Sequence, residues 1–459
     1  MTILTRTLTR RDLLKLLSAA GLGTAFARRA VADEIGAAPG NPPVPEGKLV
    51  PVTERPRFPA RLVGGKVIQP ERPLTVVSET EVLVVGAGPA GFAAAVAASR
   101  LGVKTMLVER YGYFGGQWTG GLVLLVISSH AKENGQLVKV LRGVGDELLE
   151  RLTRIDGAIV NQAPGKFNPT TDPEATKFMM DEMVREAGVK VLLHCWVADV
   201  VMDGPVIRGV VFESKAGRQA ILARIVVDAT GDGDVFAAAG AEHEQRLHAI
   251  GLVHRLGNVD RTDLAKLQEA GFKNLGSVEP LPSVRWVNLR GPSTDCLDIA
   301  ELTRLEMEHR RSIWKRVRQM RQAPGGEKVF LLQTAPQLGV RISRLLAGTR
   351  QLTYAEAREG RKFLDTIAVG GAQNAQHRGW PIPYGVMVPR KLDNLLAAGR
   401  CICVDEPLIE DMRLIASCLT TGHAAGAAAA LSVQSGCRPR EVDVAKLQKL
   451  LVRQGAYLG

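Results

Sequence analysis

The chain has 459 residues, 46% of them hydrophobic and 23% charged, which is typical of a soluble globular protein with one large domain or two to three smaller ones. The formal net charge is +12, and residues 1–32 hold six Lys or Arg against one Asp, so the remainder is mildly basic. Aromatic residues make up 5%, and no Lys/Arg cluster is interleaved with them. This argues against a nucleic-acid-binding protein and for a surface that favours an anionic substrate.

The first 32 residues resemble a twin-arginine export signal. The motif TRRDLLK lies at 9–15, an apolar run follows at 16–27, and Ala30-Val31-Ala32 supplies small residues for a signal peptidase. The run is too short to span a bilayer as a settled helix, and a basic amphipathic helix of the mature protein is the alternative. The signal predicts an exported, periplasmic protein that uses the twin-arginine export machinery. Residues 33–75, rich in Pro and Gly, are expected to form a linker or a surface arm.

A glycine-rich turn follows the first apolar strand pattern. Residues 82–85 predict a buried strand, G-x-G-x-x-G spacing follows, and an alanine-rich helical pattern continues to Arg100. A second strand is expected at 105–108, and Glu109 ends it. This order is typical of a dinucleotide grip, although an ordinary glycine-rich turn would show the same glycines.

Each glycine of this grip has its own physical role. Gly86 allows a tight turn, Gly88 lets a pyrophosphate approach the backbone, and Gly91 lets the helix pack close to the sheet. The helix N-terminus offers free N–H groups to the phosphates, and Glu109 can accept hydrogen bonds from a ribose. The grip alone does not separate FAD from NAD.

The remaining elements are assigned by periodicity. A second glycine loop, at 115–121, follows Glu109, and the turn at 228–234 is rich in Asp but lacks EF-hand spacing, so no metal site is expected. Helices are expected at 140–155, 173–187, 298–322, 353–368 and 412–436, and strands within 189–201, 207–214, 225–227 and 393–405. The last helix is apolar like a membrane span, but its Ala, Gly, Ser and Thr favour tight packing against a sheet or cofactor.

The six cysteines show no C-x-x-C and no zinc spacing. Cys401 and Cys403 are either a redox pair or, as favoured here, small buried residues that point to opposite faces of a strand.

Taken together, these motifs resemble the FAD-dependent oxidoreductases of the two-dinucleotide-binding-domain flavoprotein class. Besides the grip, the resemblance depends on ERYGYFGGQWTGG, VVDATGDGDVFAAAGA, GVRISRLLAG, IPYGVMVPRKLDNLLAAGRCI and MRLIASCLTTGHAAGAAAAL, in this order over about residues 80–458. The class implies an α/β fold, with a Rossmann-like FAD-binding domain around a parallel central sheet and an inserted α+β substrate domain. The expected division is FAD-binding segments at 76–245 and 380–459, with the substrate domain at 246–379.

The resemblance also implies which residues hold FAD. They are expected at the pyrophosphate and ribose (Gly86, Gly88, Pro89, Ala90, Gly91, Glu109, Arg110, Gly231 and Asp232), at adenine (Val197), and at the ribityl chain and isoalloxazine (Gly116, Gln117, Trp118, Gly399 and Arg400). No second G-x-G-x-x-G with strand and helix is visible, so a separate NAD(P)H domain is not expected. Electrons would then leave to oxygen, a quinone or a small carrier protein.

The catalytic candidates are polar residues expected near the flavin: His130, Arg341, Tyr384, Glu406 and Arg413. For His130 a structural role is the alternative. Asp405 is a further candidate. Members of the family often carry a different, His-containing sequence in this place, so the resemblance does not assign a catalytic base here. For His423 the alternative to a site residue is a core histidine whose hydrogen bonds are satisfied within the protein. Arg341 and Arg344 are each either carboxylate forks or members of buried ion pairs.

The function expected from this sequence is an exported FAD-dependent oxidoreductase, a dehydrogenase or oxidase, that acts on a small organic molecule by hydride transfer to or from flavin. The alternatives are a non-catalytic or electron-transfer flavoprotein, and a flavin enzyme whose reaction is not a redox step. The fold cannot name the substrate, because one scaffold hosts many chemistries.

Overall fold

The computed structural model describes residues 58–160, 168–371 and 378–459. The predicted signal peptide, and the predicted arm as far as residue 57, lie outside the described residues. Contacts divide the chain into two units, Met1–Arg72 and Pro73–Gly459. In the first unit, strands β1 (Arg61–Val63) and β2 (Lys66–Ile68) pair as an antiparallel hairpin whose residues are all exposed.

The second unit is built on a sheet that has seven strands in the described part of the chain, in the order β10-β11-β12-β3-β4-β9, with β23 paired to β12. The strands are β3 (Thr75–Val85), β4 (Thr105–Val108), β9 (Lys190–Leu192), β10 (Trp196–Asp203), β11 (Val206–Ser214), β12 (Gly217–Asp228) and β23 (Leu395–Ala397). Pairing is parallel from β23 and β12 through β3 and β4 to β9, and antiparallel among β10, β11 and β12. The predicted α/β fold with a parallel central sheet is confirmed.

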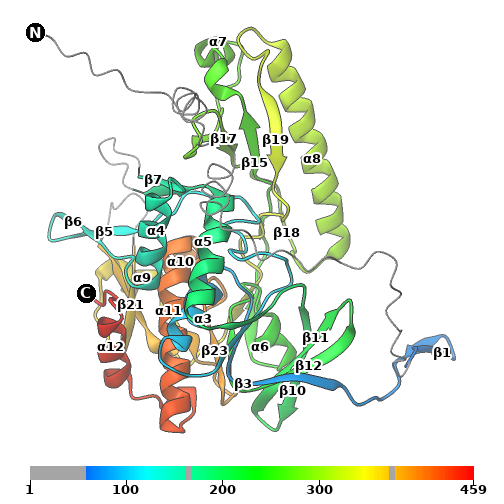
Figure 1. Cartoon of the computed structure of the whole chain (residues 1–459), viewed down its shortest axis with the longest axis vertical. Helices are drawn as coiled ribbons and strands as arrows, with labels where there is room; N and C mark the ends of the chain where they lie inside the picture. Colours follow the sequence, from blue (N-terminus) through cyan, green and yellow to red (C-terminus); the bar gives the residue numbers. More distant parts are fainter. Residues whose placement is uncertain (1–57, 161–167, 372–377) are drawn as a thin grey trace, which may run out of the picture. The chain divides into compact units, whose positions relative to one another are not determined.

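Two small-residue helices pack against each other beside this sheet. They are α3 (Pro89–Ser99) and α11 (Ile415–Ser435), labelled in Figure 1. Both are buried along most of their length. A Cβ on Gly422 would stand 2.1 Å from the carbonyl oxygen of Ala90, and one on Gly426 would stand 2.1 Å from that of Ala94. Larger side chains would force the helices apart, so the expected tight packing of the last helix is confirmed.

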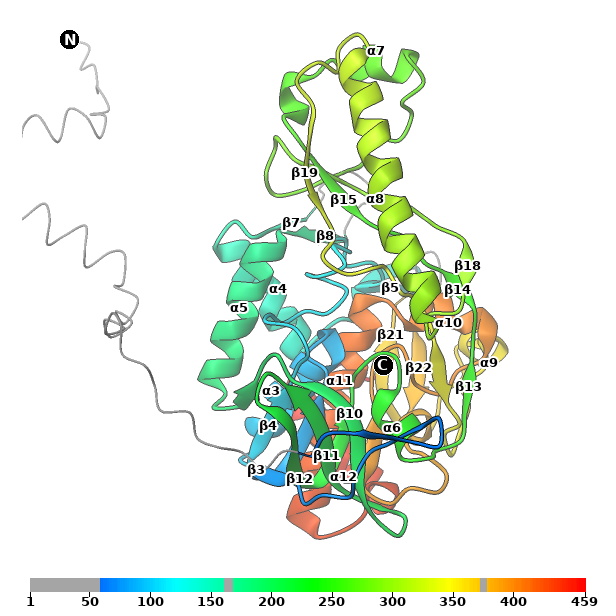
Figure 2. The ribbon, with the colours of Figure 1, turned by 90° about the vertical axis from the view of Figure 1, so that its right-hand side faces the viewer.

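A second, antiparallel sheet is formed by residues between the two parts of the central sheet. Its strand order is β16-β17-β15-β19, with β15 (His254–Gly257), β16 (Ser277–Val278), β17 (Arg285–Val287) and β19 (Phe330–Thr334). Helix α8 (Ile299–Gln322) lies alongside β15 and β19 in both views (Figures 1 and 2). Its buried apolar residues, Leu305, Ile313, Val317 and Met320, join the core that the sheet residues Leu256 and Trp286 also form. We call this sheet with α8 the cap.

Several predicted elements have different bounds in the structure. The helix expected at 353–368 is only α9 (Tyr354–Glu359), because Gly360 adopts a left-handed conformation that ends it, and β21 (Thr366–Gly370) follows. The strand expected within 189–201 is two strands, β9 and β10, separated at His194, whose φ is 59°.

The last predicted helix is preceded by a second one that the sequence reading missed. Helix α10 (Glu406–Met412) begins at the N-cap Asp405, and α11 starts at Ile415 after a bend of 88°. No single helix of the described ranges is long and apolar enough to span a membrane; only these two together would pass that test by length and composition.

The six cysteines are free thiols. Cys401 and Cys403 are buried in two different core clusters, so they point to opposite sides as expected, although both lie after β23 rather than in a strand.

Candidate active site

A cavity of about 410 Å³ lies where the glycine turn after β3, the turn after β12, the cap and the start of α11 meet. Its lining includes Gly88 and Gly231 from the central sheet, Trp286 and Arg341 from the cap and the segment after it, and Ile415 from α11. The cavity therefore joins the predicted nucleotide grip to residues that lie far away in the sequence.

The glycine turn is shaped to receive a group at Gly88. Gly86 has φ 91°, and a Cβ there would stand 2.6 Å from the carbonyl oxygen of Ala229. A Cβ at Gly91 would stand 1.7 Å from the carbonyl oxygen of Gly86. A Cβ at Gly88, in contrast, would meet only the Cα of Gly116, at 4.0 Å. Two glycines are thus required by the protein's own backbone, whereas Gly88 faces open space that a pyrophosphate fits.

The carboxylate of Glu109 is held in place by two backbone N–H groups. Its side chain is buried, Oε2 accepts a hydrogen bond of 2.7 Å from the N–H of Ala87, and Oε1 accepts one of 3.0 Å from the N–H of Tyr111. A carboxylate has about four lone-pair sites, so both oxygens keep capacity for ribose hydroxyls. The neighbouring Arg110 lies over the rings of Tyr111 and Trp196, at 5.0 and 5.1 Å from their centroids.

The second glycine loop and the start of the last helix form another part of the cavity lining. Gly116, Gln117 and Trp118 line the cavity, and the indole N–H of Trp118 donates a 2.8 Å hydrogen bond to Thr171 Oγ1. Leu414 caps α11 without a side-chain hydrogen bond and lines the cavity. The N-terminus of α11 therefore brings partial positive charge to the cavity, which stabilises a negatively charged group there.

Most of the residues predicted to hold FAD come together in this lining. Pro89, Ala90, Arg110, Val197, Gly231, Gly399 and Arg400 line the cavity with the residues described above. Gly91 and Asp232 do not: Gly91 packs against Gly86, and Asp232 accepts a hydrogen bond from the side chain of Arg400. These residues fit FAD, whose pyrophosphate would lie at Gly88 and whose ribose would lie at Glu109.

Of the predicted catalytic residues, Arg341 and Arg413 line the cavity and the other three do not. The hydroxyl of Tyr384 is buried and donates a 2.8 Å hydrogen bond to the carbonyl of Pro439. Glu406 is exposed and lies 3.4 Å from Arg246. His130 lies on β5 (His130–Glu133), where burial and then Lys139 lower its pKa to about 4.

The other candidates have structural partners. Arg344 lies 3.0 Å from Asp234, so of its two alternatives the ion pair is the one observed. Nε2 of His423 lies 2.8 Å from Gln454 Oε1 in the core, as a satisfied core histidine would. Asp405 accepts hydrogen bonds from the N–H groups of Leu408 and Tyr354.

Glu410 and His248 are polar residues that the sequence reading did not select. Glu410 lines the cavity, and its Oε1 lies 2.7 Å from Nε2 of His248. Its Oε2 accepts a 3.1 Å hydrogen bond from Nε of Arg413. The i,i+3 spacing of Glu410 and Arg413 is the sequence signal that could have identified these two residues as an ion pair. To use this signal, the reader of the sequence would first have had to predict helix α10.

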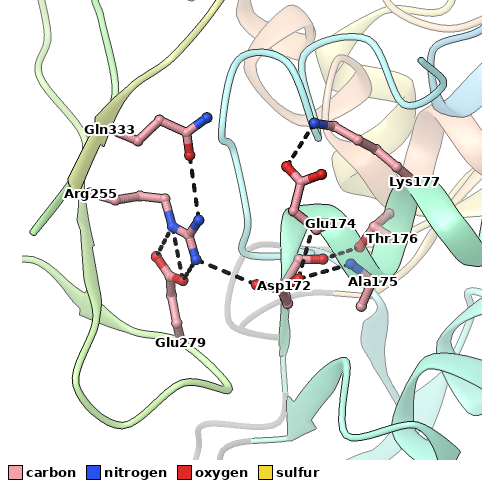
Figure 3. Close-up of polar contacts among 8 residues, drawn as sticks. All are labelled: Asp172, Glu174, Ala175, Thr176, Lys177, Arg255, Glu279 and Gln333. Atoms are coloured by element: carbon pink, nitrogen blue, oxygen red, sulfur yellow. Dashed lines mark hydrogen bonds and ion pairs between the residues drawn. The ribbon is translucent and has the colours of Figure 1, made fainter. Parts of the chain in front are cut away.

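The cap is tied to the central part by a buried ionic cluster (Figure 3). On β15, Arg255 Nε donates 3.0 Å and 3.1 Å hydrogen bonds to the two carboxylate oxygens of Glu279. Arg255 Nη2 lies 3.4 Å from Asp172, the N-cap of α5 (Pro173–Glu186). The side chains of Arg255 and Glu279 are 7% and 0% exposed. Trp286 faces Arg255 across the strand pair, so the cluster holds the sheet that forms one cavity wall.

Comparison with known proteins is consistent with this geometry. The family model described as FAD dependent oxidoreductase matches residues 81–251 and 252–451. The thiamine thiazole synthase of Methanococcus vannielii is 33% identical over 164 residues, which are 33% of this chain and 56% of that protein. The thiamine thiazole synthase of Sulfolobus acidocaldarius is 32% identical over 189 residues, 38% of this chain and 63% of that protein. The match thus spans less than two thirds of these relatives.

Two solved structures resemble this chain over most of its length. A geranylgeranyl bacteriochlorophyll reductase-like protein from Thermoplasma acidophilum has a TM-score of 0.45 and 14% identity, over 83% of this chain and 84% of that one. The p-nitrophenol 4-monooxygenase of Pseudomonas putida has a TM-score of 0.43 and 14% identity, over 82% of this chain and 84% of that one.

Proposed function

Because the chain belongs to the family of FAD dependent oxidoreductases, we propose that it is an exported enzyme that oxidises or reduces a small organic molecule. FAD is its cofactor, and when bound it supplies a ring that can accept or give a hydride. The substrate is proposed to bind in the part of the cavity that the cap covers.

The observation that carries this proposal is the continuity of the cavity. The same space is lined by Gly88 and Glu109 of the nucleotide grip and by Val253, Trp286 and Arg341 on the cap side. A cofactor that fills the grip would therefore have a pocket of mixed polarity beside its ring end, as ligand sites usually have. An electron-transfer flavoprotein would not need such a pocket.

The chain's own residues would orient the substrate and exclude water from it. Val253 and Trp286 provide an apolar wall, and Gln117, Arg341 and Arg413 provide polar groups. Glu410 is the cavity-lining carboxylate that could exchange a proton with the substrate, and it is held in place by Arg413 and by His248 Nε2, which lies 2.7 Å away. A positioned acid or base of this kind typically contributes about 10²–10⁴-fold to a proton-transfer step.

The electron acceptor is proposed to be oxygen, a quinone or a small carrier protein, because no second dinucleotide grip is visible in the sequence.

Export is proposed from the twin-arginine motif at Arg10 and Arg11. Replacing both by Lys should keep the protein in the cytoplasm of an expression host, whereas the unaltered chain should be recovered from the periplasm. Equal recovery of both proteins from the periplasm would remove the proposed route.

The redox proposal is tested by anaerobic bleaching of the flavin. The FAD-loaded protein is mixed with small alcohols, amines and organic acids without oxygen, and loss of the oxidised flavin absorbance is recorded. Bleaching by one class, followed by recolouring with oxygen or a quinone, is the expected result. If a compound is instead converted with no net oxidation or reduction, the result would support a flavin enzyme whose reaction is not a redox step.

A further inference from the structure

Arg341 is a cation in the cavity lining that has only neutral hydrogen-bond partners. Its Nη1 donates a 2.6 Å hydrogen bond to the carbonyl of Ala249, and its Nη2 lies 3.4 Å from Oδ1 of Asn288. No carboxylate of the described residues forms an ion pair with it within 4.0 Å. Arg344, three residues later, does have such a partner in Asp234. The sequence leaves both arginines the same two roles, and the structure separates them.

The groups around Arg341 leave an excess of positive charge. Arg413 and Arg290 are close enough to interact with it electrostatically, and Glu410 is the acidic group that opposes them. Both oxygens of Glu410 are already engaged, one by Arg413 and the other by His248. Burial, and then Arg413 and Arg290, lower the pKa of Arg341 below its usual value. An anion in the cavity would relieve this unfavourable arrangement of charges.

The wall beside this cation is apolar. Val123, Leu125, Ile127, Val253 and Trp286 all contribute to the lining. Gln117 and Trp286 also line the cavity. The Oε1 atom of Gln117 and the Nε1 atom of Trp286 are buried without a hydrogen-bond partner among the described residues. A bound molecule that reaches them would supply the missing hydrogen bonds. A ligand suited to this site has an anionic end and an apolar body.

We propose that the cavity binds a small organic acid, with Arg341 holding its carboxylate and the wall of Val253 and Trp286 holding its apolar body. This rests on the proposed function, because it names the substrate class of the same site. The planar guanidinium of an arginine matches a carboxylate in geometry and charge, because two of its N–H groups can bind the two carboxylate oxygens side by side. Arg413, which also lines the cavity, is already held by Glu410.

The test uses benzoate as the probe and benzamide as its uncharged match. Each is titrated into the FAD-loaded protein, and the change in the visible flavin spectrum gives the dissociation constant. Benzoate should bind more tightly than benzamide. Arg341→Gln should raise the dissociation constant of benzoate by about tenfold to a hundredfold, the range expected for hydrogen bonds to a charged group. Arg341→Lys should recover part of the loss, and benzamide binding should change little in either variant.

Arg285→Gln is the matched control. Arg285 precedes Trp286 on β17, so its side chain points to the other face of the cap sheet, and its replacement removes the same charge. Benzoate affinity should stay within about twofold of the unaltered protein. An equal loss in Arg285→Gln would show that net charge, not Arg341, holds the anion, and would overturn the proposal. Loss of FAD from both Arg341 variants, with benzoate affinity unchanged in the fraction that keeps FAD, would also overturn it.

The result separates this inference from the redox proposal. Binding of benzoate that depends on Arg341, with no organic acid able to bleach the flavin, would support the carboxylate site and leave the redox proposal to fail. Bleaching by a neutral substrate, with benzoate and benzamide binding equally, would overturn the carboxylate site and support the redox proposal.

Discussion

The Nη2 atom of Arg400 lies 2.6 Å from Oδ1 of Asp232, although 168 positions separate the two residues in the chain. Ser343 donates a second 2.6 Å hydrogen bond to the same oxygen. The two charged side chains are only 11% and 14% exposed. Arg400 and Gly231 line the cavity, so this ion pair joins the turn after β12 to the turn after β23 at the cofactor site.

Asp232→Asn should therefore destabilise the protein and weaken FAD binding. The change leaves the Arg400 guanidinium buried without its counter-charge, which typically costs about 3–5 kcal/mol. The free energy of unfolding in urea measures the loss, and FAD fluorescence titration measures the affinity. The control is Asp203→Asn, because Asp203 pairs with Arg208 at the surface, where both side chains are more than half exposed. That change should cost less than about 1 kcal/mol. Equal losses in the two variants would show that burial of the Asp232 pair has no energetic consequence.

Gly88→Ala and Gly91→Ala should fail in different ways. An alanine at 88 meets open space, so the apoprotein should fold, at a cost of about 1 kcal/mol or less for the helix N-cap, but FAD should bind more weakly. An alanine at 91 would place its Cβ 1.7 Å from a backbone oxygen, so the variant should be recovered unfolded or insoluble. Circular dichroism and FAD titration distinguish the outcomes. A Gly88→Ala protein with unchanged FAD affinity would contradict the position given to the pyrophosphate.

Arg255→Met should be more damaging than replacing Arg255 and Glu279 together. The single change leaves the fully buried Glu279 carboxylate without its cation and should cost about 3–5 kcal/mol. Changing Arg255 to Met and Glu279 to Leu removes both charges, so most of that loss should be recovered. Urea unfolding of the two variants gives the comparison. If the double variant is no more stable than the single one, the cluster contributes mainly through packing rather than charge.

Acidification should destabilise the cap through His254. This residue is 2% exposed, and burial, followed by the charge of Arg316, lowers its pKa from 6.5 to about 4. The unfolded chain takes up the proton first, so stability is fully present above about pH 6.5 and is lost as the pH falls towards 4. The loss amounts to roughly 3 kcal/mol for a shift of this size.

His254→Gln removes this titration, so its free energy of unfolding should vary less between neutral and acidic pH. Arg316→Gln should reduce the pH dependence by a smaller amount, because burial is the larger cause of the shift. Urea unfolding at several pH values checks both. An unchanged slope in His254→Gln would mean that other groups produce the acid sensitivity.

The sequence by itself determined the local unit that is typical of a dinucleotide-binding site. Strand, glycine turn, helix, second strand and Glu109 are consecutive, and each depends on short-range sterics and periodicity, so residues 82–109 could be read directly. The small residues of α11 likewise predicted close helix packing. The structure confirms it, because Gly422 and Gly426 lie directly against the backbone of α3. Local reading failed at 353–368, where one left-handed glycine ends α9, and at α10, whose seven residues are too few to show a clear period.

Only the tertiary structure decided what the charged residues do. Arg341 and Arg344 are three residues apart and alike in sequence, yet one pairs with Asp234 and the other faces the cavity. Glu410 and His248 meet across 162 positions. The role of a charge depends on which distant groups surround it and on how much water remains, and neither is encoded in the neighbouring residues.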